Sequence, residues 1–492
     1  MIMHNSDDTI VAPATPIGEG GIGIVRMSGP SALDIADKIF VSKDGKSPSE
    51  YETYSVHYGH IVDERRLSAE APSSCSGGLN LHYSMENAKA ETTNDEIIDE
   101  VLLTVMKAPK SYTKEDVVEI NCHGGIQAMK DVLNLVVKHG GRIAEPGEFT
   151  KRAFLNGRID LIQAEAVLDI IRARTEGSLK AAMAQLDGKL SGDVSDILDK
   201  LVGIASHIEA AIDFPDEQLD IMKEEDIAGR VKELTTRIRR LIDSFNEGVV
   251  LREGILAVIC GKPNVGKSSL MNLLLKRDRV IVAPVPGTTR DAVEETINLR
   301  GIPIRLADTA GIGAVKDVLY KKSAERSKRY IERSDIILLM LDASTQINEE
   351  DMVIKRLVEN KKKIVIINKI DIGKKIDEKM AANLFANDVI IEVSVEKKKN
   401  IELLEKAILK AVFSGNFIQG ESSLVTNARH KDFLDKAFKN MESTLTLIRD
   451  LSHPELIAVD IKEAIFNLGM IIGRSVSDDV LDRIFENFCV GK

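Results

Sequence analysis

The segment GKPNVGKSS at residues 261–269 constrains the fold of this chain more than any other feature. It follows the apolar run GILAVIC, which has the pattern of a buried strand, and it opens a stretch with helical spacing. Gly261, Gly266, Lys267 and Ser268 match a P-loop. In such a loop the glycines let backbone N–H groups face the phosphates, the lysine reaches the β- and γ-oxygens, and the serine hydroxyl binds Mg²⁺. The sequence therefore predicts a strand–loop–helix unit that holds a nucleoside triphosphate.

Four further motifs indicate that this nucleotide is GTP. GTTRD (287–291) offers Thr289 as a switch residue for the Mg²⁺ shell, and DTAG (308–311) ends a strand with a second carboxylate on the metal side. NKID (368–371) supplies a carboxylate that can accept both N–H groups of the guanine edge, which adenine lacks. The segment VSVE ends the last strand, where a backbone N–H can meet the guanine oxygen. The residues expected to bind GTP are Asn264, Val265, Gly266, Lys267, Ser268, Ser269, Thr289, Asp308, Thr309, Ala310, Gly311, Asn368, Lys369, Ile370, Asp371, Ser394, Val395 and Glu396.

Composition limits the setting in which the chain works. The four cysteines (Cys75, Cys122, Cys260 and Cys489) form no C-x-x-C pair, which favours a reducing compartment over disulfides or a zinc site. No apolar run approaches the roughly 20 residues of a membrane span, so we expect a cytoplasmic protein with no membrane partner. The net charge is −11, whereas a nucleic-acid binder usually has a basic footprint. An RNA substrate would therefore need a local basic patch or a partner protein.

The order of patterns along the chain predicts a multidomain protein of α+β and α/β class. Residues 1–147 mix short strand-like runs with glycine-rich turns, and residues 64–94 have the composition of a mobile surface insertion. Helical spacing dominates residues 148–250 and again residues 416–492. Between them, residues 251–415 alternate strands and helices, which predicts a doubly wound, Ras-like domain inserted into a helical one.

Strings outside the P-loop domain carry a resemblance to one family. The segments DDTIVAPATPIGEGGIGIVRMSG, YTKEDVVEINCHGG, PGEFTKRAFLNGRIDL, AAIDFPDE and FCVGK resemble signatures of the tRNA-modification GTPase family MnmE. The resemblance implies a tetrahydrofolate-binding N-terminal domain, a helical domain and an inserted GTPase domain. It also implies a homodimer that acts on tRNA in a heterotetramer with an FAD-containing, MnmG-type partner. Together the two proteins place a carboxymethylaminomethyl or aminomethyl group on C5 of the wobble uridine, using a 5-formyl or methylene tetrahydrofolate.

The resemblance also assigns folate contacts to Arg26, Glu119, Arg158 and Lys492. At position 158 the family commonly has lysine, which is a point charge, whereas arginine is a planar fork. Spacing alone favours solvated surface cations at Arg26 and Arg158, and without the family Glu119 fits a polar strand face equally well. The folate assignment therefore depends on the resemblance.

A second implied ligand is K⁺ beside the β- and γ-phosphates, in the role that an arginine finger plays elsewhere. The matching positions are Asn264, Ala283, Val285 and Thr288. Ala283 and Val285 offer only backbone carbonyls, which suit a hard cation. Without the resemblance, Asn264 would be a variable P-loop position. The resemblance thereby adds to the GTP site Ala283, Pro284, Val285, Pro286, Gly287 and Thr288.

Three interpretations of Cys489 compete. Its place four residues from the end matches a prenylation signal, but Gly491 is not aliphatic and Lys492 is not a usual last residue. It could instead be a small buried apolar residue beside Phe485 and Phe488. The resemblance favours the third interpretation, in which the tail returns to the folate site and Cys489 serves the modification chemistry.

Two other functions fit the GTPase motifs alone. A ribosome-assembly or RNA-scaffold GTPase without folate chemistry would need a basic RNA-binding domain, which residues 1–150 do not offer. A clamp whose GTP hydrolysis only resets a partner is compatible with the motifs but not with a folate-binding N-terminus.

The chain departs from the family where the hydrolytic water is positioned. The family has a glutamate twelve residues after the DTAG aspartate, and that position here is Tyr320, whose ordinary pKa near 10 makes it a poor base. Asp317 lies three residues earlier, one helical turn away if the segment is helical. We predict that Asp317→Ala lowers K⁺-stimulated turnover several-fold with GTP affinity intact, and that Tyr320→Glu raises turnover. Single-turnover hydrolysis in KCl tests both, and equal rates in all three proteins would mean that another group holds the water.

Overall fold

The computed structural model describes residues 8–63, 97–213, 224–278, 294–308, 328–412 and 423–492. It divides into two compact units. One contains residues 1–165 together with 475–492, and the other contains residues 166–474. This division differs from the expected one, which ended the first domain at 147 and left the last eighteen residues with the helices. The reason is that Phe149, in the first helix after residue 147, packs with Ile10 and Ala12 of the N-terminal sheet, and the C-terminal tail approaches Pro13 at Gly491.

The first unit is built on a seven-stranded sheet with the order β3-β4-β5-β6-β2-β1-β7. All neighbouring strands are antiparallel except β1 and β7, which are parallel. The strands are β1 (Ile10–Pro13), β2 (Gly20–Ser28), β3 (Phe40–Ser42), β4 (Ser55–Val62), β5 (Ile97–Met106), β6 (Val117–Gly124) and β7 (Arg142–Ile143).

Helices cover one face of this sheet and leave a second, more polar face for other contacts. The helices α1 (Ala32–Ile39) and α3 (Ile126–Lys138) pack against the strands through a buried apolar core. In α3 the buried residues Met129, Val132 and Val136 follow helical spacing. Successive strand residues face opposite sides. Met27 and Val118 therefore enter this core, and their neighbours Arg26 and Glu119 lie on the other face.

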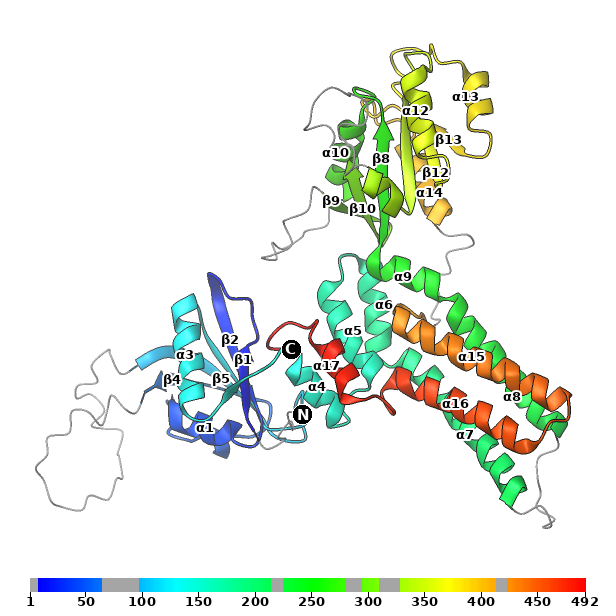
Figure 1. Cartoon of the computed structure of the whole chain (residues 1–492). Helices are drawn as coiled ribbons and strands as arrows, with labels where there is room; N and C mark the ends of the chain where they lie inside the picture. The colour runs from blue at the N-terminus through cyan, green and yellow to red at the C-terminus, as the bar shows by residue number, and fades with distance from the viewer. Residues whose placement is uncertain (1–7, 64–96, 214–223, 279–293, 309–327, 413–422) are drawn as a thin grey trace, which may run out of the picture. The chain divides into compact units, whose positions relative to one another are not determined.

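The second face is where the two ends of the chain meet. Helix α4 (Glu148–Leu155) contacts α17 (Asp478–Phe485), as Figure 1 shows in cyan and red. A short 3-10 helix, η1 (Pro48–Glu50), lies near α1. Gly147 precedes α4 with φ +72, and a Cβ there would lie 2.7 Å from the Phe485 carbonyl oxygen. Only glycine combines that φ with this close approach at low cost.

In the second unit, residues 255–412 form the expected Ras-like domain. Its sheet has the order β13-β12-β11-β8-β10-β9, parallel except for the β9–β10 hairpin. The strands are β8 (Ile255–Gly261), β9 (Glu294–Leu299), β10 (Ile302–Asp308), β11 (Ile336–Asp342), β12 (Lys363–Asn368) and β13 (Val389–Glu392). The helices are α10 (Lys267–Asp278), α12 (Glu349–Leu357), α13 (Glu378–Leu384) and α14 (Ile401–Val412).

The unbroken apolar run of β8 has a simple packing origin. Alternate residues of the strand enter two different cores, with Ala257 and Ile259 on the side of α10 and α14. Val258 and Cys260 enter the core on the side of α12 and α13. A central parallel strand is covered on both faces, so it needs apolar side chains at every position.

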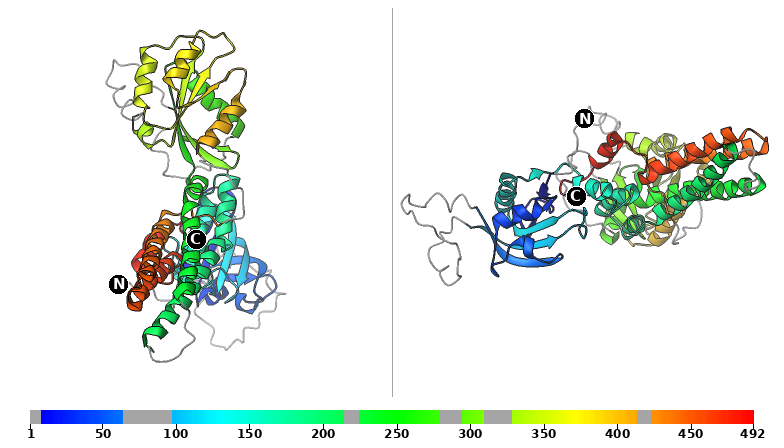
Figure 2. Two further views of the ribbon diagram at one scale, coloured as in Figure 1. Left: turned by 90° about the vertical axis from the view of Figure 1, so that its right-hand side faces the viewer. Right: turned by 90° about the horizontal axis from the view of Figure 1, so that it is seen from below.

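The other described elements of the second unit are helices. They are α6 (Glu176–Leu186), α7 (Lys189–Asp213), α8 (Glu224–Asp243), α9 (Phe245–Glu253), α15 (Ala428–Arg449) and α16 (Pro454–Ile472), while α5 (Leu161–Arg172) spans the boundary between the units in sequence. The long helices α7, α8, α15 and α16 lie side by side in a bundle, which both views of Figure 2 show in green and orange. The Ras-like domain enters between α9 and α15, as the sequence predicts. No helix within the described residues is long and apolar enough to cross a membrane.

Candidate functional site

The P-loop has the expected place between β8 and α10. Gly261 has φ +150, and a Cβ there would lie 2.6 Å from the Met340 carbonyl oxygen. Gly266 has φ +104, and a Cβ there would lie 2.4 Å from Asn368 Nδ2. Both positions therefore require glycine. Between them Asn264 also has a left-handed φ of +65. The loop is tightly turned, and it ends at the N-terminus of α10, the end of a helix that favours an anionic ligand.

The carboxamide of Asn368 joins three of the predicted motifs. Its Nδ2 donates to the Val265 carbonyl oxygen in the P-loop (2.8 Å), and its Oδ1 accepts from the Val395 N–H (3.1 Å). Asn368 is buried at the end of β12. One side chain therefore fixes the distance between the phosphate loop and the segment expected to face guanine.

Two carboxylates beside this tether stay ionised. Burial opposes the charge of Asp342, but hydrogen bonds from Lys369 and Ser344 outweigh it and lower the pKa of Asp342. Lys369 Nζ lies 2.7 Å from Asp342 Oδ2. A hydrogen bond from the Ser394 side chain lowers the pKa of the exposed Asp371. Asp371 is thus an accessible, ionised acceptor three residues after Asn368, which contacts the P-loop.

The structure places the other nucleotide residues as follows. Lys267 starts α10, and its ammonium donates to the carbonyl oxygens of Gly261 (2.9 Å) and Lys262 (2.8 Å). Asp308 ends β10 and pairs with Ile259 of β8. It therefore lies at the carboxyl end of these parallel strands, the end from which the P-loop continues. The residues that lie outside the described ranges are Ala283, Pro284, Val285, Pro286, Gly287, Thr288, Thr289, Thr309, Ala310, Gly311, Asp317 and Tyr320. Their predicted roles remain predictions.

A second polar cluster lies on the open face of the N-terminal sheet. Arg26 of β2 and Glu119 of β6 are directly opposite each other in the register. Arg26 Nε donates to Glu119 Oε1 at 2.7 Å, and the two side chains are 17% and 19% exposed. The ion pair is therefore shielded from bulk water but remains open on one side. It leaves part of the guanidinium fork free for other partners.

The C-terminal tail supplies one of those partners. Arg26 Nη1 donates to the Gly491 carbonyl oxygen at 3.3 Å, across 465 residues of sequence. Gly491 is buried with φ +91, and a Cβ there would lie 2.1 Å from the Pro13 carbonyl oxygen at the end of β1. The Gly147 N–H donates to the carbonyl oxygen of Cys489 (3.4 Å). The tail is thus held at Cys489 by the residue that precedes α4 and at Gly491 by strands β1 and β2.

Cys489 itself is a free, exposed cysteine. Its neighbour Phe488 is buried, and Phe488 packs against Phe485 with ring centroids 5.2 Å apart. The apolar anchor of the tail is therefore phenylalanine, and the thiol lies outside the core. This excludes a buried structural cysteine. Lys492 is half-buried, and its N–H donates to the Cys489 carbonyl oxygen (3.3 Å).

Aromatic residues that the sequence analysis did not single out lie under the cations. The guanidinium carbon of Arg26 is 6.0 Å from the ring centroid of Tyr112 and 5.8 Å from that of Phe149. The guanidinium carbon of Arg158 is 4.7 Å from the Tyr112 ring centroid. Two of the predicted folate residues, Arg26 and Arg158, therefore lie over the ring of Tyr112, and Glu119 joins them through its ion pair with Arg26. Tyr112 belongs to the segment YTKEDVVEINCHGG that carries the family resemblance, but no spacing in the sequence indicates that its ring approaches Arg158.

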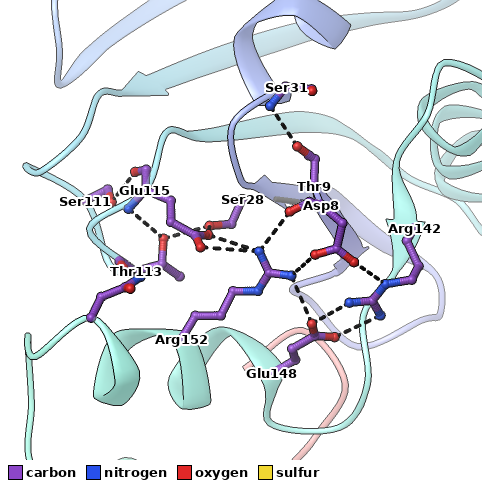
Figure 3. Close-up of polar contacts among 11 residues, drawn as sticks. Asp8, Thr9, Ser28, Ser31, Ser111, Thr113, Glu115, Arg142, Glu148 and Arg152 are labelled. Atoms are coloured by element: carbon purple, nitrogen blue, oxygen red, sulfur yellow. Dashed lines mark hydrogen bonds and ion pairs between the residues drawn. The ribbon is translucent and has the colours of Figure 1, made fainter. Parts of the chain in front are cut away.

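A charge network centred on the buried Arg152 and Glu148 lies beside the start of β1 (Figure 3). The Arg152 guanidinium donates to Asp8 Oδ1 (2.5 Å), Glu148 Oε1 (3.1 Å) and Glu115 Oε1 (3.3 Å), and Arg142 Nη2 donates to Glu148 Oε1 (2.6 Å). Burial alone would raise the pKa values of Asp8 and Glu148, but hydrogen bonds from the two arginines outweigh burial and lower both. The network joins the start of β1, the loop before β6 and helix α4.

The nucleotide site generates a direct test of base specificity. In Asp371→Asn the amide can donate where the carboxylate could only accept, so we expect GTP affinity to fall and affinity for xanthosine triphosphate to rise. The loss of hydrogen bonds to a charged group is worth about 3 kcal/mol, which corresponds to roughly 100-fold in Kd. Calorimetric titration with both nucleotides measures the change, and unchanged GTP affinity would contradict the guanine assignment.

Comparison with known proteins gives matches along the whole chain. A family model described as "GTP-binding protein TrmE N-terminus" matches residues 9–158, and one described as "MnmE helical domain" matches residues 161–489. The chain is 43% identical over 486 residues to a tRNA modification GTPase MnmE from Alkaliphilus oremlandii, covering 99% of each chain. It is also 43% identical over 488 residues to the protein of that name from Carboxydothermus hydrogenoformans, covering 99% of this chain and 100% of the other. A crystal structure of Aquifex aeolicus Era is 33% identical over 38% of this chain, with a TM-score of 0.27.

Proposed function

Since the chain belongs to the tRNA modification GTPase MnmE family, we propose that it hydrolyses GTP in support of tRNA modification. With an FAD-containing, MnmG-type partner it adds a carboxymethylaminomethyl or aminomethyl group to C5 of the wobble uridine. The one-carbon unit comes from a 5-formyl or methylene tetrahydrofolate. The observation that carries this proposal is the docking of the C-terminal tail at the Arg26–Glu119 pair through Gly491.

The GTP part of the proposal rests on residues of the second unit. The glycine cradle leaves no space for a Cβ at Gly266, and the tether through Asn368 joins the P-loop to Val395. Lys267 would contact the β- and γ-phosphates, and Asp371 would select guanine. Ser268 and Thr289 would hold Mg²⁺, which neutralises charge on the phosphates when bound.

The folate part rests on residues of the first unit. Glu119 is an acceptor for N–H groups of a heterocycle, and Arg26 and Arg158 are donors for carbonyl or carboxylate oxygens. The folate, when bound, supplies the one-carbon unit. The exposed Cys489 is attached through its neighbours to the same face of the sheet, so it would act at that ligand rather than at GTP.

The proposed homodimer has a candidate surface on the same sheet. Val41, Val56, Tyr58 and Leu102 are large exposed apolar side chains. Tyr58 of β4 lies opposite Leu102 of β5, so the two form one patch on the sheet. Exposed apolar patches of this kind mark association surfaces. They support dimer formation through the N-terminal sheets.

We predict that K⁺ accelerates GTP hydrolysis relative to Na⁺, because a bound monovalent cation would supply part of the roughly 10³–10⁵-fold effect of an arginine finger. Asn264, Ala283, Val285 and Thr288 would hold the ion. We expect at least about a tenfold difference between KCl and NaCl at matched ionic strength. Asn264→Gly tests the contribution of the side-chain amide alone, because glycine adopts the φ of +65 without strain and the substitution removes only the side chain. Equal rates in the two salts would refute the K⁺ assignment.

We also predict that Cys489→Ser abolishes tRNA modification in the presence of the partner protein and leaves GTP hydrolysis near normal. The reason is that Cys489 belongs to the first unit and the P-loop to the second. Mass spectrometry of the wobble nucleoside measures the first effect and phosphate release the second. Val490→Ser, at the exposed neighbouring position, is the matched control and should modify tRNA normally. A large loss of GTP hydrolysis in Cys489→Ser would overturn this division of labour.

The alternatives are a ribosome-assembly GTPase and a GTP-dependent clamp, neither of which uses a folate. Titration of the full chain with 5-formyl-tetrahydrofolate separates them from the proposed function. Binding that is lost in Arg26→Ala supports the folate assignment. An intact protein that does not bind the folate would favour one of the alternatives.

A further inference from the structure

We infer that Tyr112 is a positioning residue of the proposed folate site, which holds the Arg158 guanidinium beside Arg26. The inference deepens the proposed function and rests on it. Its basis is the placement of both cations around one phenol ring, at 4.7 Å for Arg158 and 6.0 Å for Arg26.

The ring of Tyr112 is fixed from several directions. Its hydroxyl shares a hydrogen bond with Thr150 Oγ1 of α4 (2.9 Å), and Thr150 is fully buried. On either side in sequence, Ser111 Oγ donates to the Glu115 carbonyl oxygen (2.5 Å), and Thr113 Oγ1 is hydrogen-bonded to Ser28 Oγ (2.6 Å). Figure 3 shows Ser111 and Thr113, the sequence neighbours of Tyr112, beside Glu115, which Arg152 contacts. The ring is therefore a rigid part of the sheet face, not a mobile surface tyrosine.

Arg158, in contrast, depends on the ring for its position. It is an exposed residue just after α4. Within the part of the chain that the structure describes, no carboxylate lies within ion-pair distance of its guanidinium, which lies over the Tyr112 ring. Burial raises the pKa of Tyr112, so the ring stays neutral and its π-face attracts a cation.

This arrangement also explains why arginine can serve at position 158. A guanidinium is planar and weakly hydrated, so it can lie against an aromatic face and still direct its N–H groups outward. An exposed arginine without a carboxylate partner keeps its hydrogen-bonding capacity for an anionic or carbonyl group of the ligand. Tyr112 would reduce the conformational freedom that Arg158 loses when the ligand binds.

The test compares variants of the full-length protein by calorimetric titration with 5-formyl-tetrahydrofolate. Tyr112→Leu should raise the Kd about tenfold, because the cation loses its ring and its fixed position. Tyr112→Phe keeps the ring and should stay within about twofold of the parent. Phe433→Leu is the matched control, since Phe433 also has a cation, Lys436, 4.9 Å from its ring centroid, but lies in the second unit, whereas Arg26 and Arg158 lie in the first. It should leave the Kd unchanged.

A double variant shows whether the ring acts through the arginine. If Tyr112 positions Arg158, then Tyr112→Leu should weaken binding little or not at all in an Arg158→Ala background. An equal loss in both backgrounds would overturn the inference, because the ring would then act on the fold or on the ligand directly. Tyr112→Leu with the parent Kd would also overturn it. If the parent itself does not bind the folate while its GTP hydrolysis is intact, the proposed folate function fails and the role of Tyr112 fails with it.

Discussion

The ion pair between Arg26 and Glu119 organises the unit that the two ends of the chain form. It bridges neighbouring strands on the face of the sheet that α1 and α3 leave open. Removing either partner of a half-buried ion pair of this kind would destabilise the fold, because the charge that remains would be desolvated without compensation. The same guanidinium binds the Gly491 carbonyl oxygen, so the pair also determines where the tail can dock.

The tail shows how packing presents a reactive group without burying it. Phe488 and Gly491 are the buried positions, and Cys489 and Val490 lie exposed between them. The contact at Gly491 is between backbones, with the Pro13 carbonyl oxygen too close to admit a side chain. A thiol fixed in this way would lose little conformational entropy in acting on the proposed ligand, since its flanking residues are already ordered.

In the second unit, a small number of hydrogen bonds likewise holds the predicted nucleotide site together. The Asn368 carboxamide joins the P-loop to the Val395 backbone, and the Ser394 side chain in turn lowers the pKa of Asp371. The loop predicted to bind phosphate and the segments predicted to face the base are therefore connected through a few hydrogen bonds. The residues predicted to bind GTP all belong to the second unit and those predicted to bind the folate to the first, which is why we expect the variants to separate GTP hydrolysis from tRNA modification.

The sequence by itself determined the features that local patterns encode. The P-loop glycines, the apolar run of β8 and the order of the GTP motifs predict a Ras-like domain, because short-range backbone geometry and strand burial impose these residues. Only the tertiary structure decided what meets across the sheet. The contact of Gly491 with Arg26 spans 465 residues, and the approach of Tyr112 to Arg158 depends on how α4 packs beside the loop before β6. No periodicity or spacing encodes such contacts, because they depend on the register of strands and the packing of distant segments.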